Sequence, residues 1–344
     1  MKTIRWGIIG CGDVTEVKSG PGFQKATHSS LVAVMRRTGK LAEDYARRHG
    51  VSKWYDDAEA LINDPEVDAV YIATPPDSHK PYTLAVAAAG KPVYVEKPMA
   101  RNFSECQEMI AACRAAGVPL FVAYYRRALP RFLKVKELID SGAIGQVRAV
   151  SVKLHQPPRQ NLDPQNLPWR VVPEIAGAGL FLDLASHTLD FLAYFLGPIR
   201  AVQGFAANQA GLYRAEDIVA GTFVFENGAH GVGSWCFTGF ESADVNEVAG
   251  HKGKIVFSSF SDAPVTLTTA AGVTHFEIEH PPQVQQPLIQ TIVDELNGHG
   301  LCPSTGKSAA RTSWVMDQML RSTPRVVLPI GGYRGVQGYR SGQG

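Results

Sequence analysis

The sequence predicts an α/β protein, with an N-terminal doubly wound parallel sheet followed by a second unit built on a large, mostly antiparallel sheet. Over the first 120 or so residues, short apolar runs alternate with helical segments, as in parallel sheets covered on both faces. After about Tyr124, longer strands of alternating polarity follow one another through turn sequences. We therefore predict domains at residues 1–123 and 124–330, and a flexible Gly-rich tail at 331–344.

The first domain is predicted from five apolar strands and the helices between them. The expected strands are residues 4–9, 31–35, 69–73, 92–95 and 120–122. The expected helices are residues 40–49, 58–62, 83–89 and 104–116. A further helix should follow the first strand, and Gly20-Pro21-Gly22 should interrupt it.

The second domain is predicted to contain helices over residues 130–141 and 180–196. The expected strands are residues 147–155, 201–207, 218–226, 229–237, 245–250, 254–258, 265–269 and 273–278. Glu226-Asn227-Gly228 and Ala270-Ala271-Gly272 have the composition of hairpin turns, so neighbouring strands should run antiparallel.

Composition excludes several classes of protein. The 344 residues are 45% hydrophobic, which is enough for two domains of roughly 100–200 residues each and excludes general disorder. The 34 Lys and Arg residues against 32 Asp and Glu leave a formal net charge of +2. This charge is too small and too evenly spread for a protein that binds a phosphate backbone, so we expect no nucleic-acid partner.

The sequence also predicts a soluble, cytoplasmic protein without a membrane partner. No uninterrupted apolar run approaches the ~20 residues that cross a bilayer, and a strand follows Met1 where a secretory leader would have its apolar segment. The five cysteines are odd in number and lack C-x-x-C spacing. We therefore expect neither a disulfide framework nor a metal site.

A candidate nucleotide site follows the first strand, where Gly10-Cys11-Gly12 must turn the chain into a helix. Gly10 permits the turn, and Gly12 lets the backbone, with Asp13 and Val14, approach a pyrophosphate. Thr15 takes the third position of G-x-G-x-x-G, so only two of the three glycines are present. Such turns also occur for structural reasons, but the position after the first strand favours dinucleotide binding.

Two arginines after the second strand predict which dinucleotide binds. An Asp or Glu normally stands there and binds the ribose 2′-hydroxyl of NAD, but this chain has Arg36 and Arg37. A guanidinium can pair with a 2′-phosphate through two hydrogen bonds and stack on adenine. We therefore predict NADP(H), with NAD(H) possible; a loop that is basic by chance is the alternative.

Three groups of residues, taken in order, make the chain resemble the Gfo/Idh/MocA family of oxidoreductases. They are Ile72-Ala73-Thr74-Pro75-Pro76 with His79, then Glu96-Lys97-Pro98, and finally Gly177-x-Gly179-x3-Asp183-x3-His187-x2-Asp190. The resemblance extends to about residue 325. It implies an N-terminal Rossmann domain and a C-terminal α/β domain with a large open-faced antiparallel sheet. It further implies NAD(P)-linked chemistry on sugars, cyclic polyols and related compounds, and homodimers or homotetramers formed through that sheet.

The resemblance also implies roles for single residues. Lys97 resembles the family's active-site lysine, and Asp183 and His187 its acid/base pair. The residues implied near the cofactor, besides Lys97 itself, are Thr74, Pro75, His79 and Glu96. The residues in stretches that line the pocket of relatives are Tyr125, Arg126, Trp169 and Arg170. To these we add His155, which ends a strand predicted to face the pocket; His79 could equally be a helix-start residue.

The predicted helix over 180–196 supports the acid/base roles from its own composition. The segment is apolar almost all round and should be buried. Asp183, His187 and Asp190 stand at i, i+4 and i+7 and share one stripe. A carboxylate one turn before an imidazole can fix its tautomer and raise its pKa, as a proton shuttle requires. A satisfied structural network is the alternative, and for Asp190 it is an equally good interpretation.

Lys97 is predicted at the carboxyl end of a parallel strand, the edge where such sheets bind ligands. Pro98 restricts the backbone after it, and Glu96 could pair with Lys97 or bind the nicotinamide ribose. An exposed lysine at the start of a loop is the alternative interpretation.

We predict a reversible ketone/alcohol conversion, in which hydride passes between the nicotinamide and a carbon of a sugar, cyclic polyol or dihydrodiol. Lys97 and His187 would bond the reacting oxygen, one of them would move its proton, and Asp183 would orient the imidazole. One alternative is an NAD-dependent glycosidase on the same fold. Another is a non-catalytic nucleotide sensor, which would have no need of Lys97, Asp183 and His187 together.

Overall fold

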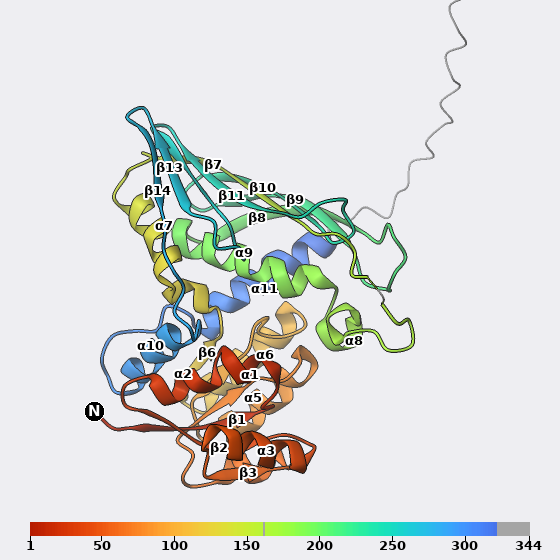
Figure 1. Cartoon of the computed structure of the whole chain (residues 1–344), viewed down its shortest axis with the longest axis vertical. Helices are drawn as coiled ribbons and strands as arrows, with labels where there is room; N and C mark the ends of the chain where they lie inside the picture. Colours follow the sequence, from red (N-terminus) through yellow and green to blue (C-terminus); the bar gives the residue numbers. More distant parts are fainter. Residues whose placement is uncertain (161, 322–344) are drawn as a thin grey trace, which may run out of the picture.

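The computed structural model describes residues 1–160 and 162–321, so the prediction of a flexible tail at 331–344 lies outside the described residues. Figure 1 shows two units, with the N-terminal sheet and its helices at the bottom and a large sheet at the top. A layer of helices lies between them.

The N-terminal sheet contains six parallel strands in the order β3-β2-β1-β4-β5-β6. The strands are β1 (Ile4–Ile9), β2 (Ser29–Met35), β3 (Lys53–Tyr55), β4 (Ala69–Ile72), β5 (Val93–Val95) and β6 (Leu120–Val122). The helices are α1 (Asp13–Val17), α2 (Gly20–Lys25), α3 (Gly39–His49), α4 (Ala58–Asn63), α5 (His79–Ala88) and α6 (Phe103–Ala115), with the 3₁₀ turn η1 (Pro76–Ser78) before α5. The strand order reverses between β1 and β4, and in such sheets ligands bind at that switch point.

The predicted doubly wound sheet is confirmed, and its interior explains why. All residues of β4 and β5 are buried, as expected for strands covered on both faces. On one face, Trp6, Phe23, Tyr71 and Tyr94 form an aromatic layer in which the two tyrosine rings stack with centroids 4.7 Å apart. The edge strand β3 was not predicted, because its three residues are not fully buried and leave no apolar run.

The predicted interruption after the first strand is also confirmed, since α1 ends at Val17 and α2 begins at Gly20. A Cβ on Gly20 would collide with the hydroxyl of Tyr45 and the carbonyl oxygen of Thr15. Glycine therefore stands here because the Tyr45 hydroxyl crosses this point to donate to the Thr15 carbonyl at 2.8 Å. The break is a packing feature of the domain.

The second sheet has eight strands in the order β14-β13-β12-β11-β7-β10-β9-β8. The strands are β7 (Val147–His155), β8 (Ile199–Ala207), β9 (Ile218–Phe225), β10 (His230–Cys236), β11 (Ala243–Gly250), β12 (Gly253–Phe257), β13 (Val265–Thr269) and β14 (Gly272–Phe276). All neighbours run antiparallel except β7 and β10, which pair in parallel. The predicted mostly antiparallel sheet is confirmed, with β7 and β10 as the parallel exception.

One face of this sheet packs on helices and the other is open. Among the described residues the helices of this unit are α7 (Pro130–Asp140), α8 (Pro173–Ala176), α9 (Leu180–Leu196), α10 (Gln286–Leu296) and α11 (Gly306–Arg321), with 3₁₀ turns η2 (Tyr125–Ala128) and η3 (Trp169–Val171). Figure 1 shows α7, α9 and α11 on the lower side of the sheet. In β7, Val150, Val152 and Leu154 point to these helices and are buried, whereas the residues between them point away.

The helices α10 and α11, which were not predicted, return the chain to the N-terminal domain. α10 packs against α2, and α11 packs against both α6 and α9. Phe121 of β6 forms an isolated antiparallel bridge with Thr305, the residue before α11. The predicted boundary at residues 123/124 stays a prediction. The two units contact each other through α10 and α11.

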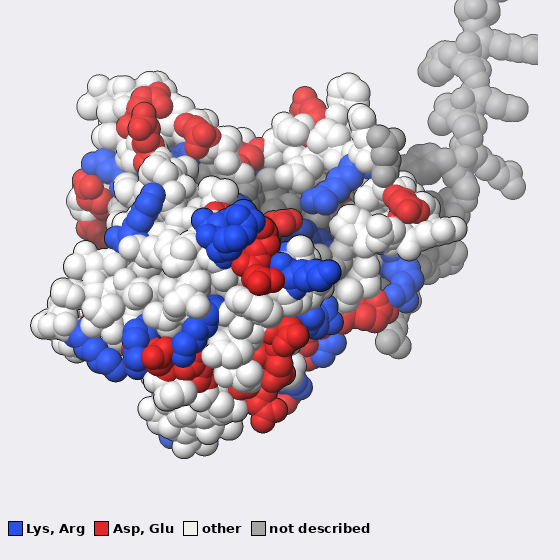
Figure 2. All heavy atoms as spheres, turned by 60° about the horizontal axis from the view of Figure 1, so that its bottom comes forward, with Lys and Arg blue, Asp and Glu red and all other residues white. Residues whose placement is uncertain are grey.

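Charge on the molecular surface is mixed. Figure 2 shows Lys and Arg side chains interspersed with Asp and Glu over the face formed by the N-terminal domain. Within the described residues, one stretch, Pro173–Leu196, is long and apolar enough to cross a membrane, but 78% of it is buried inside the molecule. This stretch contains α9 and forms core.

Candidate active site

The glycine turn after β1 has the backbone that the sequence predicts. Gly10 has φ +90°, and a Cβ there would stand 2.7 Å from Thr74 Cγ2, so both conformation and space require glycine. A Cβ on Gly12 would meet no protein atom closer than 3.9 Å. The protein itself therefore leaves open space at Gly12, next to Asp13 and Val14 in the first turn of α1, where a phosphate could approach the backbone.

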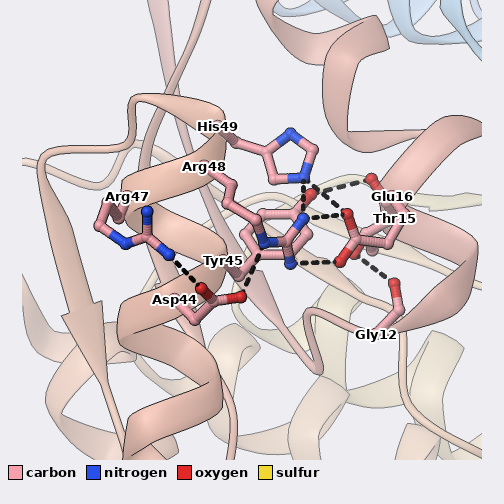
Figure 3. A network of polar contacts seen from close by, with 8 residues as sticks. All are labelled: Gly12, Thr15, Glu16, Asp44, Tyr45, Arg47, Arg48 and His49. Carbon is pink, nitrogen blue, oxygen red and sulfur yellow. Dashed lines mark hydrogen bonds and ion pairs between the residues drawn. The ribbon is translucent and has the colours of Figure 1, made fainter.

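Thr15, at the position of the missing third glycine, is accommodated by hydrogen bonds. Its hydroxyl donates to the Gly12 carbonyl at 2.7 Å, and its own carbonyl accepts from Tyr45. Figure 3 shows the rest of this connection, in which Arg48 on α3 donates through two nitrogens to Glu16 on α1, at 2.7 and 2.8 Å. His49 contacts the same carboxylate at 2.8 Å. Hydrogen bonds to Arg48 lower the pKa of Glu16 to about 2, so this network holds α1 against α3 as an ion pair over the ordinary pH range.

The two arginines after β2 lie beside this turn. Arg36 is half-buried and Arg37 is exposed, and within the described residues neither forms an ion pair or a side-chain hydrogen bond. The main chain of Arg36 donates to Tyr55 of β3 at 3.1 Å. The positive charge of Arg36 acts on Cys11 in the glycine turn, although burial is the larger effect and raises the pKa of that thiol to about 11. Arg36 is thus a free cation at the position that the sequence predicts.

A second turn approaches the same edge of the sheet after β4. Thr74 lies against Gly10, and its hydroxyl is buried without a hydrogen-bond partner among the described residues. Pro75 precedes η1, and His79 follows it. The His79 ring is fully buried, with Nε2 2.7 Å from the Thr74 carbonyl and Nδ1 3.1 Å from that of Pro98. The ring thus joins the turns that follow β4 and β5, and His79 is the first residue of α5, as its helix-start interpretation has it. Its contact with the cofactor stays a prediction.

Glu96 directly follows β5, and its carboxylate does not make the predicted contact with the Lys97 side chain. Its carboxylate accepts from the Tyr71 hydroxyl at 2.5 Å, the Gln285 amide at 2.6 Å and its neighbour's backbone N–H, that of Lys97, at 3.0 Å. The carboxylate is buried and does not pair with the Lys97 ammonium. The predicted pairing with the lysine is therefore wrong, and the carboxylate is already occupied by protein donors.

Lys97 reaches from the N-terminal domain to α9. Its Nζ donates to Asp183 Oδ1 at 2.6 Å and to the Asp183 carbonyl at 3.2 Å, and the bond between Lys97 and Pro98 is cis. The other carboxylate oxygen of Asp183 accepts from Arg170 Nε at 3.1 Å. Burial alone would raise the pKa of Asp183, but the two cations outweigh it and hold that pKa below its ordinary value. Asp183 therefore stays ionised and fixes the ammonium of Lys97.

His187 stands one turn further along α9 with its imidazole unbonded. The ring is 4% exposed, and its Nδ1 is buried without a hydrogen-bond partner among the described residues. Burial, followed by the positive charges of Arg126, Lys97 and Lys18, holds the pKa of His187 well below its ordinary value. The ring is therefore neutral at pH 7 and retains a free acceptor nitrogen.

This arrangement corrects the predicted relation between the two α9 residues. Asp183 was expected to orient the His187 imidazole and raise its pKa, but its oxygens bond Lys97 and Arg170 instead. Tyr125 packs edge-on against the His187 ring with centroids 5.5 Å apart. Aromatic packing, and not a carboxylate, therefore positions this imidazole.

Aromatic rings and a guanidinium surround His187. Arg126 is buried, donates to the Ser259 carbonyl at 2.9 Å and has an unpartnered Nη1 within the described residues. Its guanidinium lies 4.7 Å from the ring centroid of Phe260, which is also 5.8 Å from His187. Trp169 lies under Arg170 at 4.3 Å. Except for Phe260, these residues were predicted to bind substrate.

Phe260 was missed because it lies in the loop after β12, outside any motif. Its backbone N–H donates to Asp244 at 2.6 Å, and neighbouring carbonyls accept from Arg131. The fixed loop leaves this ring 39% exposed beside the imidazole. An aromatic residue between Ser258-Ser259 and Ser261 was the only sequence signal.

The third polar residue of the α9 stripe is part of the core. Asp190 accepts from Arg127 Nε and Nη2, both at 2.8 Å, and from Thr312 at 3.3 Å. Burial raises the pKa of Asp190, and Arg127 opposes this shift. Of the two interpretations of Asp190, the structural one is confirmed. The described residues contain no group of three or more His, Cys, Asp or Glu arranged to hold a metal ion.

Comparison with known proteins identifies the family. Residues 4–124 match the oxidoreductase family with an NAD-binding Rossmann fold, and residues 132–256 match the GFO/IDH/MocA C-terminal domain. These two matches together cover more than half of the chain. The chain belongs to the Gfo/Idh/MocA family of oxidoreductases. The predicted family and the predicted class, an NAD(P)-dependent oxidoreductase, are thereby confirmed.

Relatives match along nearly the whole chain. An oxidoreductase of Formosa agariphila is 40% identical over 91% of this chain and 97% of its own length. The 1,5-anhydro-D-fructose reductase of Ensifer adhaerens is 30% identical over 88% of this chain and 91% of its own. The solved structure of aldose-aldose oxidoreductase from Caulobacter crescentus, complexed with glycerol, superposes with a TM-score of 0.83 at 25% identity, covering 93% and 97%.

In this Gfo/Idh/MocA member, one predicted substrate residue lies away from the site. His155 alternates with the buried Leu154 along β7, so its side chain is on the open face of the sheet, where Nε2 lies 2.9 Å from the hydroxyl of Ser234. The expectation that His155 faces the pocket from the end of its strand is therefore wrong. The two-residue periodicity of the strand could have excluded it, because its neighbour is the residue that faces α9.

Proposed function

We propose that this protein is an NADP(H)-dependent dehydrogenase or reductase that interconverts a hydroxyl and a carbonyl on a sugar, cyclic polyol or dihydrodiol. The observation that carries the proposal is the pair of unlike proton-handling groups at one edge. Lys97 is held by Asp183, while His187 is neutral and unbonded one turn away. Such a pair suits a reaction in which an oxygen gains or loses a proton while a carbon exchanges hydride.

The residues around the glycine turn fit a dinucleotide. The open space at Gly12, the unpartnered hydroxyl of Thr74 and the free guanidinium of Arg36 all border the carboxyl edge of the sheet. We assign the pyrophosphate to Gly10, Gly12, Asp13 and Val14, and the 2′-phosphate to Arg36 and Arg37. NADP(H), when bound, supplies or accepts the hydride. The absence of a carboxylate at residues 35–38 supports NADP(H) over NAD(H).

Proton transfer then divides between two side chains. In the oxidising direction, His187 can accept the hydroxyl proton, because its lowered pKa keeps the imidazole neutral and its Nδ1 has no hydrogen-bond partner among the described residues. The Lys97 ammonium, fixed by Asp183, donates a hydrogen bond to the same oxygen and stabilises negative charge that develops on it. In the reducing direction the same groups act in reverse. Asp183 and Arg170 thus serve Lys97, and they do not bond His187.

The walls of the site support a ring-shaped polyhydroxy substrate. Tyr125 and Phe260 offer apolar faces next to His187, and the unpartnered Nη1 of Arg126 offers a donor for a hydroxyl. Trp169 and Arg170 border the opposite side of Asp183. The names of two relatives, a 1,5-anhydro-D-fructose reductase and an aldose-aldose oxidoreductase, are in line with this substrate class.

We further propose that the protein forms homodimers or homotetramers through the open face of the second sheet. Phe205, Val232, Val245 and Val273 are exposed large apolar side chains on its strands. A row of such residues across several strands favours a protein partner, and a second copy of the same face satisfies two-fold symmetry. The cytoplasmic location stays a prediction.

The test is a substrate panel with both nucleotides. Sugars, ketosugars, cyclic polyols and a dihydrodiol are incubated with NADP⁺ or NAD⁺, and reduced nucleotide is measured by absorbance at steady state. We expect net reduction with at least one cyclic substrate and a preference for NADP⁺. The Arg36→Asp variant should favour NAD⁺, because a carboxylate repels the 2′-phosphate, whereas Arg47→Asp is the matched control. Substrate cleavage without net redox change would overturn the proposal and favour the glycosidase.

A further inference from the structure

We propose that Gln285 is a positioning residue of the active site, and that its amide holds Glu96 so that the Lys97 turn keeps its place. This inference rests on the proposed function for its kinetic consequence only. The hydrogen bonds themselves do not depend on that function. Gln285 belongs to the chain segment after the second sheet, yet its side chain contacts Tyr94 and Glu96 of the first domain. No motif in the sequence marks it.

Gln285 is the fully buried N-cap residue of α10, and its side-chain amide and its backbone N–H all form hydrogen bonds with residues of the first domain. Its Nε2 donates to Glu96 Oε1 at 2.6 Å, and its Oε1 accepts from the Tyr94 hydroxyl at 2.9 Å. Its backbone N–H donates to the Lys18 carbonyl at 3.2 Å. The amide therefore has one orientation, fixed from both ends.

The hydrogen bonds continue from Glu96 to the catalytic lysine. Glu96 Oε1 also accepts from the Tyr71 hydroxyl, and Oε2 accepts the backbone N–H of Lys97 at 3.0 Å. Glu96 is 6% exposed, so water cannot easily replace a lost donor. Removal of the Gln285 amide would leave Oε1 with Tyr71 alone. The carboxylate would then rotate or take up a proton, and its hold on the Lys97 backbone would loosen.

The amide of Gln285 meets two opposite demands at this point. Tyr94 requires an acceptor and Glu96 requires a donor, and the glutamine side chain supplies one of each. A glutamate at 285 would accept from Tyr94 but could donate to Glu96 only while one proton is shared between the two carboxyls. A leucine would supply neither group. This difference gives the proposal a signature that depends on pH.

Small displacements of the Lys97 backbone matter because the ammonium group of this lysine is in direct contact with Asp183. Lys97 Nζ lies 2.6 Å from Asp183, which belongs to the other unit. The network of Gln285 thus spans the same two parts of the chain as the catalytic contact. Misplacement of a reacting group by about 1 Å can reduce a rate by roughly a hundredfold. We therefore expect loss of Gln285 to lower turnover more than substrate or nucleotide binding.

The titratable groups that face Glu96 come from several elements. They are Tyr71 on β4, His79 at the start of α5, Tyr94 on β5 and Lys97 itself, and Lys18 contributes its carbonyl to Gln285. Burial raises the pKa of both tyrosines well above their ordinary value and lowers that of His79. None of these three groups therefore titrates with the shared proton of a Gln285→Glu variant around neutral pH.

The experiment compares Gln285→Glu and Gln285→Leu with the same changes at Gln290. Gln290 lies on the same helix, contacts Thr27 of the first domain and also donates to a carboxylate, that of Asp294. We expect Gln285→Leu to lower kcat by about tenfold or more, with Kd for NADPH unchanged within about twofold. Gln285→Glu should have near-normal kcat at acidic pH and lose it as pH rises, because the shared proton leaves. The Gln290 variants should show neither effect.

A second measurement is independent of turnover. Hydrogen exchange of the Lys97 backbone N–H, which donates to Glu96, should be faster in Gln285→Leu and become faster with pH in Gln285→Glu, beyond the intrinsic dependence seen in wild type. Unchanged kcat in Gln285→Leu, or the same relative pH profile in Gln285→Glu and wild type, would overturn the positioning role. If wild type shows no hydride transfer with any substrate, the proposed function fails, and the exchange data alone decide the role of Gln285.

Discussion

The helix α9 contains two buried carboxylates two turns apart, and they illustrate two different uses of an ion pair. Asp183 pairs with Lys97 and Arg170, and Asp190 pairs with Arg127. The Arg127–Asp190 pair is closed, with side-chain exposures of 6% and 1%, and Thr312 completes it. The pair that Asp183 forms with Lys97 is open, because Lys97 is 15% exposed and Arg170, the second cation on Asp183, is 41% exposed.

The difference lies in what each pair leaves unsatisfied. At Asp190, the forked contact with Arg127 and the hydroxyl of Thr312 use the carboxylate fully, so nothing remains for a ligand. Beside Asp183, the imidazole of His187 has no hydrogen bond among the described residues. A shared stripe on a helix therefore does not imply a shared role. Buried polar groups that lack a hydrogen-bond partner are the better indicator of a reactive site.

The largest effect is expected when the open pair is broken. Lys97→Met should lower kcat by about 10²- to 10⁴-fold, because it removes the charged donor to the reacting oxygen. His187→Ala should also lower kcat, and Kd for NADPH should change little in both variants, since neither side chain belongs to the glycine turn or the arginines that we propose to hold the phosphates. Steady-state rates and nucleotide fluorescence titration measure these quantities.

Lys80→Met is the matched control for this prediction. Lys80 also pairs with a carboxylate in the same domain, that of Glu108, but on the surface. Its replacement should leave the rate unchanged. Normal turnover in both Lys97→Met and His187→Ala would contradict the assignment of the open pair to catalysis.

Breaking the closed pair should affect stability. Arg127→Met leaves Asp190 buried without its cation, and we expect a loss of about 3–5 kcal/mol in the free energy of unfolding. Arg170→Met is the comparison at the open pair, where partial exposure limits the expected loss to about 1 kcal/mol while kcat falls. Urea unfolding measures both. Equal losses in the two variants would remove the distinction between the pairs.

This comparison also shows what the sequence could reveal about the site. The family resemblance implied that Lys97 and Asp183 belong to one active site, and the two side chains do meet, although they come from different parts of the chain. It could not predict that Asp183 bonds Arg170 and not His187, because that choice depends on how η3 packs beside α9. The error at His155 was avoidable, since strand periodicity already placed Leu154 inward.

The same limit applies to the fold. Strands and helices with strong apolar patterns, such as β4 and α9, were predicted within a few residues. The parts that were missed depend on contacts distant in sequence. β3 is a short edge strand, and α10 and α11 bury one face against the first domain. Gln285 is the clearest case, because its partners Glu96 and Tyr94 stand about 190 residues away.

A charge next to the open pair sets the pH range of His187. Arg126 is among the cations that lower the pKa of this imidazole, after burial. Arg126→Met should raise that pKa, so the loss of oxidation rate on acidification should begin at a higher pH than in wild type. Arg126→Lys keeps the charge and should keep the wild-type profile. The dependence of kcat on pH measures the shift, and identical profiles for Arg126→Met and wild type would contradict it.

The smallest effect is expected at Glu216, which lies between β8 and β9, contacts the first residue before α9 and has no cation partner among the described residues. Glu216 accepts the backbone N–H of Gly179, the N-cap of the helix, at 2.8 Å, and burial raises its pKa to about 7 from 4.5. Because the folded-state pKa is the higher one, stability from the protonated form is complete below pH 4.5 and is lost as pH rises through about 7. Glu216→Gln keeps the acceptor without the charge. It should therefore stabilise the protein above pH 7 by on the order of 1 kcal/mol, with little effect in acid, as measured by urea unfolding across pH. A pH-independent difference would show that this carboxylate, unlike Asp183 and Asp190, needs no cation to stay charged.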